Sequence, residues 1–393
     1  MVEVLIAGAG PAGTAAAIVL ARRGMRVLLV DRATFPRDKL CGDTVNPGAM
    51  VLLGRLGLAG PVAGSGLPLD GVRVTSPRGV EVRGQYPVTA AGRAIRRRDL
   101  DALLVAAADA AGAHVETGVR VVGPLLDTSG ASPVVRGALL ERAGRRLRVP
   151  AAMVVAADGR RSALAGALGL TVAPARPRRW AVGGYFSNVE GLGREGEMHV
   201  RASHYVGIAP LPGGLANVCL VTGDRRGLAA PGARLREALA VDPLLAGRFT
   251  HARLEGAATS LGPLAVESRA AGVTGLLLAG DAAGFLDPMT GDGVRLAVHG
   301  GLLAAEATLR LFDQPATDPL RWLADARRRA FGGKLRFDRA LRALVPSAAG
   351  VRAGELVATL VPSLLRHAVW VAGDVSLADP LDDDLARCLA PTT

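Results

Sequence analysis

Hydrophobic positions at the start of the chain follow a strand, helix and strand pattern. Residues 2–7 form an apolar run with Glu3 as its one polar member, which is typical of a strand buried on both faces. An Ala-rich helix is predicted over 11–23, and Gly24 follows as its C-cap. A second apolar run at 26–30 ends at Asp31. The pattern predicts a β-α-β unit.

The pattern then becomes mixed. Short strands are expected at 72–75, 80–84 and 93–95. A helix is predicted at 98–111, and a buried strand at 152–157.

A long strand-like region covers about 171–253. Four runs alternate there between Gly and Pro breaks, which predicts an antiparallel sheet in a second domain. A buried strand within 275–285 and a long helix at about 293–311 follow. The last sixty residues are expected to form helices broken at Pro346 and Pro362.

Composition narrows the class of protein. The chain has 393 residues, half of them hydrophobic, and no apolar run approaches the ~20 residues of a membrane span. Glu3 interrupts the first apolar run and no basic lead precedes it, so a cytoplasmic protein is expected. Cys41, Cys219 and Cys388 form no CxxC pair, so neither a disulfide framework nor a metal site is expected.

The net charge of +12 does not indicate a nucleic-acid partner. Lys39 and Lys334 are the only lysines, and the many arginines are scattered in twos and threes. Aromatic residues for base stacking are only 3 % of the chain. No nucleic-acid partner is expected; an acidic substrate or anionic lipid suits the charge better.

The turn after the first strand reads G-x-G-x-x-G. Gly8 permits a tight turn, Gly10 lets the backbone approach a pyrophosphate, and Gly13 lets helix and strand pack closely. Asp31 lies eighteen residues past Gly13, where a carboxylate accepts from a ribose hydroxyl. These residues predict dinucleotide binding. A second match at 191–196 lies between strand-like runs and is interpreted as a hairpin turn.

Two further pairs point to a flavin. Asp158-Gly159 follows a buried strand, and Gly280-Asp281 ends another. With the glycine motif they resemble the p-hydroxybenzoate hydroxylase-like FAD proteins. The resemblance implies FAD near both pairs, NAD(P)H as reductant, and cofactor contacts by the remaining members of the same motifs. Those members are Ala12, Arg32 and Val294.

The segment 287–293 resembles the Pro-x-Thr-Gly-x-Gly flavin loop of that superfamily. It contains Pro288, Gly291, Asp292 and Gly293 and opens the predicted long helix. The N–H groups and positive dipole of a helix start suit the negative edge of a reduced flavin. Pro288 is also a catalytic candidate.

Two weaker correspondences complete the predicted cofactor site. Arg97 lies in a run of three arginines where the family carries an Arg against FAD phosphate or adenine, and such a run at a helix start suggests a nearby anion. Val121 matches a position whose backbone contacts adenine.

The stretch FPRDKLCGD, residues 35–43, resembles a loop of the geranylgeranyl reductase branch and of related natural-product hydroxylases. In that branch the loop lies along FAD, which implies that Cys41, Gly42 and Asp43 lie beside the isoalloxazine ring. Cys41 either tunes the flavin or contacts substrate, or it is a small buried hydrophobe, the commoner fate of a free cysteine.

The substrate sheet departs from this branch. Prenyl reductases carry Tyr-x-Trp-x-Phe-Pro, and here Tyr205 and Pro210 remain while Gly207 and Ala209 replace the two aromatics. This predicts a roomier pocket, and the lack of Trp-x-Trp-x-Ile-Pro argues against a halogenase. Tyr205 is a candidate general acid or base, ahead of two nearby histidines. They are His199 and His204.

The expected architecture is α/β: a Rossmann-type FAD-binding domain with an inserted antiparallel β substrate domain and a C-terminal helical extension. The FAD domain is placed at 1–170 and 254–325, the substrate sheet at 171–253 joined by strands near 71–95, and the helical region at 326–393. The apolar segment 355–373 is expected to cover the substrate domain, with peripheral membrane contact as the less favoured alternative.

Three functions remain open. The favoured one is an FAD-dependent monooxygenase that uses O₂ to hydroxylate an apolar or aromatic small molecule. The second is an ene-reductase that saturates prenyl double bonds. The third is a carrier of a lipid or prenylated partner without chemistry.

Overall fold

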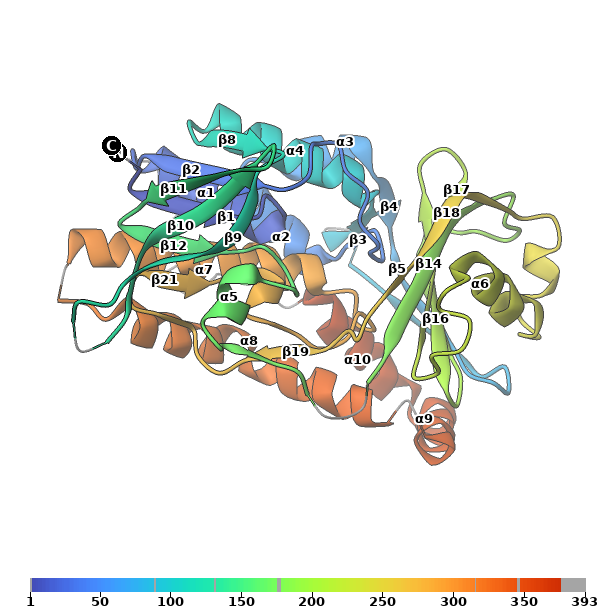
Figure 1. Cartoon of the computed structure of the whole chain (residues 1–393). Coiled ribbons are helices and arrows are strands. Elements are labelled where there is room, and N and C mark those ends of the chain that lie inside the picture. Colours follow the sequence, from blue (N-terminus) through green and yellow to red (C-terminus); the bar gives the residue numbers. More distant parts are fainter. Residues whose placement is uncertain are drawn as a thin grey trace.

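The structure is a computed structural model that describes residues 2–87, 90–130, 132–174, 178–314, 316–344 and 347–375. Cys388, Pro346 and the end of the expected helical region lie outside these residues. Figure 1 shows a sheet covered by helices beside a second large sheet.

A six-stranded sheet has the order β20-β21-β12-β1-β2-β8, and only the β20–β21 pair is antiparallel. Its strands are β1 (Val4–Ala7), β2 (Val27–Asp31), β8 (His114–Thr117), β12 (Met153–Ala156), β20 (Gly272–Val273) and β21 (Leu276–Leu278). Helix α1 (Pro11–Arg22) connects β1 to β2, and Gly24 follows it with φ +77°. The predicted β-α-β unit is confirmed.

Alternation along β1 explains the layers. Val4 and Ile6 pack with the helices, whereas Leu5 and Ala7 pack against a three-stranded sheet on the other face. The helical layer contains α1, α2 (Pro47–Arg55), α3 (Ala59–Ser65), α4 (Arg97–Ala110) and α7 (Gly293–Asp313). The small sheet contains β9 (Arg120–Asp127), β10 (Val134–Arg142) and β11 (Arg145–Pro150).

The second large sheet has seven strands in the order β18-β14-β17-β16-β15-β5-β6. They are β5 (Gly71–Thr75), β6 (Glu81–Gln85), β14 (Trp180–Ser187), β15 (Glu195–Val200), β16 (His204–Leu211), β17 (Leu215–Thr222) and β18 (Arg253–Leu261). Helix α6 (Pro231–Ala240) covers one face through a cluster that includes Val206, Ile208 and Leu235.

Several expected boundaries need correction. β18 extends the second sheet to Leu261, so the limit at 253 is too early. The strand near 93–95 is β7 (Gly92–Ala94), which pairs with β3 (Thr44–Val45) and β4 (Leu67–Leu69) instead of joining that sheet. Residues 191–196 connect β14 to β15, which are not neighbours, so they form no hairpin.

Six short elements remain among the described residues. They are α5 (Ala163–Ala167), β13 (Thr171–Val172), η2 (Gly247–Phe249), β19 (Val266–Ser268), η3 (Gly280–Ala282) and β22 (Gly284–Phe285). β13, β19 and β22 form a three-stranded sheet of their own.

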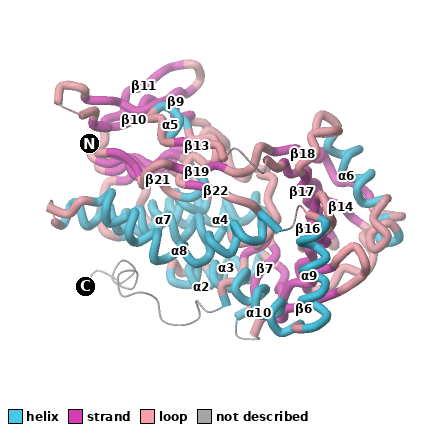
Figure 2. The backbone as a smooth tube through the Cα atoms, turned by 90° about the horizontal axis from the view of Figure 1, so that it is seen from below, coloured by secondary structure: helices cyan, strands magenta, loops and turns pink. Residues whose placement is uncertain are grey.

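The C-terminal helices are α8 (Pro319–Leu344), α9 (Ala348–Leu360) and α10 (Pro362–Gly373). α8 begins before the expected boundary at 326 and packs on α7, and α10 packs on β6 (Figure 2). Among the described residues no single helix is long and apolar enough to cross a membrane. α9 and α10 pass that test of length and composition only as a pair, bent by 110°.

Candidate active site

The predicted motifs meet at one edge of the six-stranded sheet. Gly8 follows β1, Asp31 ends β2, Asp158 follows β12 and Gly280 follows β21. These are the carboxyl ends of neighbouring parallel strands, the edge where open α/β sheets bind ligands.

The glycine turn is shaped for close backbone contact. Gly8 has φ +97°, and a Cβ there would lie 2.4 Å from the carbonyl oxygen of Ala157. A Cβ on Gly13 would lie 1.8 Å from the oxygen of Gly8. A Cβ on Gly10 would meet only Arg37 Nη2, at 3.7 Å. Gly8 and Gly13 therefore close the turn on the protein, while Gly10 faces open space suited to a phosphate.

Helix α7 approaches α1 as closely as glycine allows. A Cβ on Gly301 would lie 2.1 Å from the Ala12 carbonyl oxygen, and one on Gly280 would lie 2.8 Å from Ala12 Cβ. Ala12 thus supports the turn from inside the protein, and the starts of α1 and α7 lie beside η3.

Asp31 organises the adjoining loops. Its Oδ2 accepts from Ala9 N at 2.9 Å and its Oδ1 from Ala33 N at 2.8 Å. The backbone of β9 begins beside it, because Val119 N donates to the Asp31 carbonyl at 2.9 Å, and Val121 lies two residues further along that strand. Arg32 is exposed. The carboxylate is at the end of β2 where a ribose hydroxyl is expected.

The two Asp-Gly and Gly-Asp pairs flank the glycine turn. Asp158 Oδ2 accepts from Ala163 N at 2.9 Å, while its buried Oδ1 has no partner among the described residues. Gly159 has φ +85°. Asp281 lies 4.0 Å from Lys39 Nζ, so the 35–43 loop reaches the Gly-Asp pair.

The loop from Asp287 to Gly293 is held from the second sheet. Asp287 is buried and accepts from the hydroxyl of Tyr205 and, at 2.8 Å, from Arg179 Nη1. Pro288 follows directly. Burial and the Asp287 carboxylate raise the pKa of Tyr205 well above its usual value. Tyr205 therefore positions this loop through its hydrogen bond to Asp287. Its catalytic role stays a prediction.

The same loop presents a helix start. Gly291 has φ +65° and precedes Asp292, the N-cap of α7, whose Oδ1 accepts from Thr290 Oγ1 at 3.0 Å. The first turn of α7, which includes Gly293 and Val294, has no acidic side chain. Its N–H groups and positive end remain available to an anion.

The Cys41–Asp43 loop is clamped between the two halves of the molecule. Asn217 Nδ2 on β17 donates to the Cys41 carbonyl at 2.9 Å and to Asp43 Oδ2 at 2.6 Å. Asp43 Oδ1 accepts from Arg97 N at 2.9 Å. Asp43 is 1 % exposed with φ +51°, a strained conformation that glycine usually takes. A Cβ on Gly42 would meet only Thr44 Oγ1, at 3.7 Å.

Burial affects the ionisation of this loop. Burial raises the pKa of Asp43 to about 6, although the hydrogen bonds from Arg97 and Asn217 favour the carboxylate. Burial also raises the pKa of the Cys219 thiol to about 12, and nearby Cys41 adds to the shift. The two thiols therefore share one region of the crevice.

Arg97 differs from expectation. Its guanidinium is 5 % exposed and forms a bidentate pair with Asp101, with Nη2–oxygen distances of 2.8 and 3.0 Å. The anion that explains an arginine at this helix start is thus a carboxylate of the same helix. Burial disfavours the charge, but Asp101 and the Cys41 thiol outweigh it and raise the pKa of Arg97. Arg37, 3.1 Å from Asp101, is the arginine beside Gly10.

Small residues line the sheet face toward this loop. Tyr205, Gly207 and Ala209 alternate along β16 and so share one face. Tyr205 belongs to a cluster with partly buried Leu40, Met289, Met198, Cys219 and Phe285. A Cβ on Gly207 would meet no atom nearer than 3.9 Å. This face is apolar, and Gly207 leaves space beside it.

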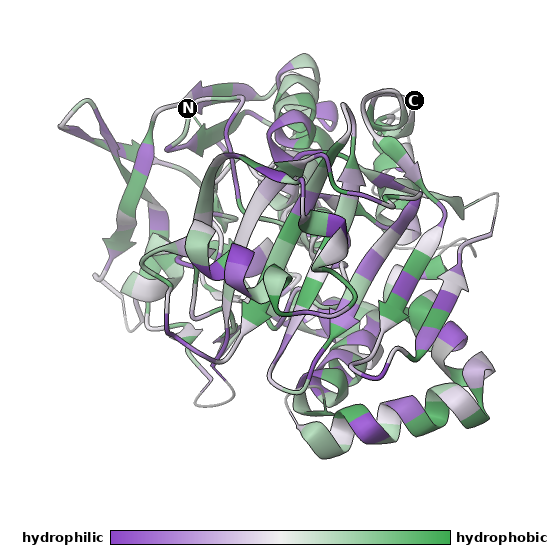
Figure 3. Ribbon diagram, turned by 90° about the vertical axis from the view of Figure 1, so that its right-hand side faces the viewer, coloured by the Kyte–Doolittle hydropathy of each residue, from purple (hydrophilic) through white to green (hydrophobic). Residues whose placement is uncertain are grey.

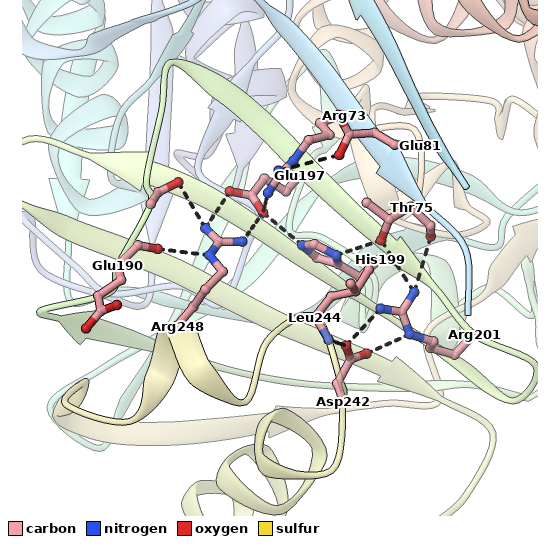
Figure 4. A network of polar contacts seen from close by, with 11 residues as sticks. Arg73, Thr75, Glu81, Glu190, Glu197, His199, Arg201, Asp242, Leu244 and Arg248 are labelled. Atoms are coloured by element: carbon pink, nitrogen blue, oxygen red, sulfur yellow. Dashed lines mark hydrogen bonds and ion pairs between the residues drawn. The ribbon is translucent and has the colours of Figure 1, made fainter. Parts of the chain in front are cut away.

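The two candidate histidines lie on the other face. His199 is paired with Val206, which packs under α6, and its ring nitrogens bond Glu197 and Thr75 at 2.8 Å each. Figure 4 shows this buried network, in which Arg248 and Arg73 also hold Glu197. His204 shares that face, two residues from Val206. Both histidines thus lie on the face of the sheet that α6 covers, opposite the face of Tyr205, and their acid–base role stays a prediction.

The carboxyl ends of these strands fit a flavin dinucleotide: they bring an open Gly10, the Gly280 turn and two helix starts to one edge of the sheet. Asp158 Oδ1, which has no partner among the described residues, follows β12 at the same edge. Residues 1–330 match the FAD binding domain family. The chain belongs to this family. It is an FAD-dependent oxidoreductase of the p-hydroxybenzoate hydroxylase-like superfamily, and the expected fold is confirmed.

Relatives of this family member include reductases. The menaquinone reductase of Mycobacterium tuberculosis is 32 % identical over 77 % of this chain and 76 % of its own length. The digeranylgeranylglycerophospholipid reductase of Methanosarcina mazei is 28 % identical over 78 % and 74 %. The solved structure of a flavin-dependent brominase shares the fold, with a TM-score of 0.81 and 22 % identity over 95 % of this chain and 93 % of that one.

Sequence reasoning missed the residues that connect the sheet to the loops. They are Asn217, Arg179, Asp287 and Arg37. The signal for Asn217 was present, since it is the polar residue within the apolar run LANVCLV. Its partner, the Cys41–Asp43 loop, lies more than 170 residues away.

Proposed function

We propose that this FAD-dependent oxidoreductase is a reductase, supplied with electrons by NAD(P)H, that saturates a carbon–carbon double bond of an apolar isoprenoid substrate. The observation that carries the proposal is the Cys41–Asp43 loop, fixed by Asn217 against an apolar sheet face. Two relatives that match about three quarters of the chain are named as reductases, which supports the same reaction type.

The cofactor contacts follow from the crevice. The turn from Gly8 to Gly13 and the start of α7 at Gly291–Val294 would hold phosphate and ring. Asp31 would accept from ribose, and Asp158 and Asp281 would flank the chain between them. Bound FAD supplies the two-electron chemistry of the reaction.

Residues of this chain would supply the rest. The apolar face around Gly207 excludes water and holds an isoprenoid chain. Cys41 would donate the proton that completes saturation, and Asp43 fixes its loop. Pro288 would contact the ring from the opposite loop, while Tyr205 positions that loop through Asp287.

A monooxygenase is the second candidate. Gly207 and Ala209 replace the two aromatics that prenyl reductases carry on this strand, and the space beside Gly207 suits a broader ring-shaped substrate. In that reaction O₂ is the co-substrate, and the product gains an oxygen atom.

One experiment separates these candidates. FAD-loaded protein is reduced with NADH or NADPH and mixed with prenylquinones or apolar phenols, under argon and in oxygenated buffer, and products are analysed by mass spectrometry. A product that gains two hydrogen atoms under argon supports the reductase. A product that gains one oxygen atom, only with O₂, supports the monooxygenase. Bound substrate with no product in either condition would leave only the carrier.

Cys41→Ala provides the matched variant. This variant should retain FAD and still be reduced by NAD(P)H, yet lose product formation. Cys219→Ala, which removes the nearby thiol on β17, should retain turnover. Equal turnover by Cys41→Ala and wild type would exclude Cys41 as the proton donor.

A further inference from the structure

The bent pair α9–α10 exposes several large apolar side chains. They are Leu356, Leu360, Val361, Leu364 and Trp370, with exposed fractions of 60, 68, 48, 55 and 45 %. They account for five of the twelve exposed large hydrophobic residues of the described chain. An apolar cluster of this kind on a surface marks an interaction site.

The charged side chains that α9 and α10 expose are of one sign. Arg352 and Arg366 are exposed, and His367 lies beside Arg366. Glu355 is the only carboxylate in α9 and α10, and it is 8 % exposed and paired with Arg78 at 3.2 Å. The outward surface is therefore apolar with a positive rim, which complements an anionic lipid surface.

The pair is held firmly at its inner end. Trp370 Nε1 donates to the Gln85 carbonyl at 2.7 Å, and Lys334 Nζ donates to the carbonyls of Val371 and Ala372 at 2.8 Å each. Asp374, directly after α10, lies 2.7 Å from Arg295 Nε at the start of α7. Helix α10 thus connects the exposed cluster to the first turn of α7.

The pair lies along one border of the molecule. Figure 2 shows α10 beside β6, and in Figure 3 green apolar bands lie between purple ones along the helix at the bottom edge, α9. The two helices meet at a bend of 110°. Helices that expose large apolar side chains beside basic ones are typical of an element that lies in the headgroup layer of a membrane.

We propose that α9–α10 is an interfacial membrane-docking element that binds anionic bilayers and presents the edge of the substrate sheet to lipid. An enzyme docked in this way takes an apolar substrate directly from the bilayer. The docking itself does not depend on which reaction the proposed function assigns, so the two fail independently.

The test is co-sedimentation of the full-length, FAD-loaded protein with sucrose-loaded vesicles. Vesicles contain phosphatidylcholine alone or equal parts of phosphatidylcholine and phosphatidylglycerol. We expect binding to the mixed vesicles that weakens with added salt. Arg352→Gln with Arg366→Gln should weaken it roughly twenty-fivefold, since each cation near an anionic surface contributes about fivefold.

The apolar contribution is tested with Leu360→Ser and Leu364→Ser. Each should weaken binding at least about tenfold, because burial of a leucine side chain is lost. The matched controls are Leu126→Ser with Leu147→Ser, two exposed leucines at 44 and 49 %, and Arg145→Gln with Arg146→Gln, all on or beside the small β9–β11 sheet. Flavin content and circular dichroism verify that each variant is folded.

Three outcomes would overturn the proposal. Equal binding to neutral and anionic vesicles would show that the basic side chains do not contribute to binding. Equal loss in the α9–α10 variants and in their controls would show general surface adhesion. Absence of vesicle binding, with a dimer in sedimentation velocity that Leu360→Ser dissociates, would assign the cluster to a second copy of the chain.

Discussion

Gly301→Ala tests how closely α7 must approach the nucleotide turn. The added Cβ would lie 2.1 Å from the Ala12 carbonyl oxygen, a backbone atom that no side-chain rotation can move. Restoring ordinary contact requires the two helices to separate by roughly 1.5 Å. Overpacking of this kind costs about 1–3 kcal/mol, whereas Gly→Ala in a helix interior alone stabilises by about 1 kcal/mol.

The net expectation is a loss of about 0–2 kcal/mol in the free energy of unfolding and at least about tenfold weaker FAD binding, since the start of α1 moves away from the phosphates. Gly332→Ala is the control, because a Cβ there meets nothing within 4 Å in α8. It should stabilise by about 0.5–1 kcal/mol without changing FAD affinity. Urea unfolding and flavin fluorescence titration measure both quantities. If Gly301→Ala is as stable as Gly332→Ala and binds FAD like wild type, the close α1–α7 packing is refuted.

Three further perturbations address the loop and the sheet. Asn217→Leu removes the hydrogen-bond donor to the Cys41 carbonyl and to buried Asp43, so the free energy of unfolding should fall by about 1–3 kcal/mol. Turnover of the FAD-loaded variant should fall as well. An unchanged KM and kcat would show that these hydrogen bonds are unimportant for the reaction. The pKa of Asp43 is raised to about 6 in the folded state, so the folded protein holds more protons than the unfolded one between about pH 4 and 6, and stability should decrease as pH rises through that window. Asp43→Asn should flatten that slope in urea midpoints measured against pH, and an unchanged slope would assign the titration elsewhere. His199→Gln should lower the unfolding midpoint by disturbing Glu197 and Thr75 but leave kcat of the folded enzyme unchanged, and a lost kcat with an intact flavin spectrum would contradict the placement of His199 under α6.

The cofactor half of the molecule was predictable because its signals are local. Gly8, Gly10 and Gly13 follow one strand and open one helix, so their roles depend on a few neighbouring residues. Gly280 and Asp158 each end a buried strand, and the parallel order of the sheet brings such ends together. The position of Gly301 against Ala12 could not be foreseen, since it depends on how two helices almost 290 residues apart pack.

The substrate half was predictable in outline only. The four runs that became β14 to β17 alternate clearly, and they were found. β18 was missed: it reads RLEGAATSL, with few strongly apolar residues, and it is largely exposed at the sheet edge. Which face of a strand meets the flavin is set by pairing register, so His199 and Tyr205 looked equivalent in sequence although β15–β16 pairing puts them on opposite faces.

The strained position of Asp43 links these two halves. A buried carboxylate in a left-handed backbone conformation lowers the free energy of unfolding for two reasons, backbone strain and desolvation. It persists because Arg97 from the cofactor half and Asn217 from the substrate half both donate to it. Neither half alone would hold Cys41 in place. The Cys41–Asp43 loop is therefore fixed only when the second sheet packs against the FAD-binding half. A variant that loosens this interface should lose the position of Cys41 before it loses FAD.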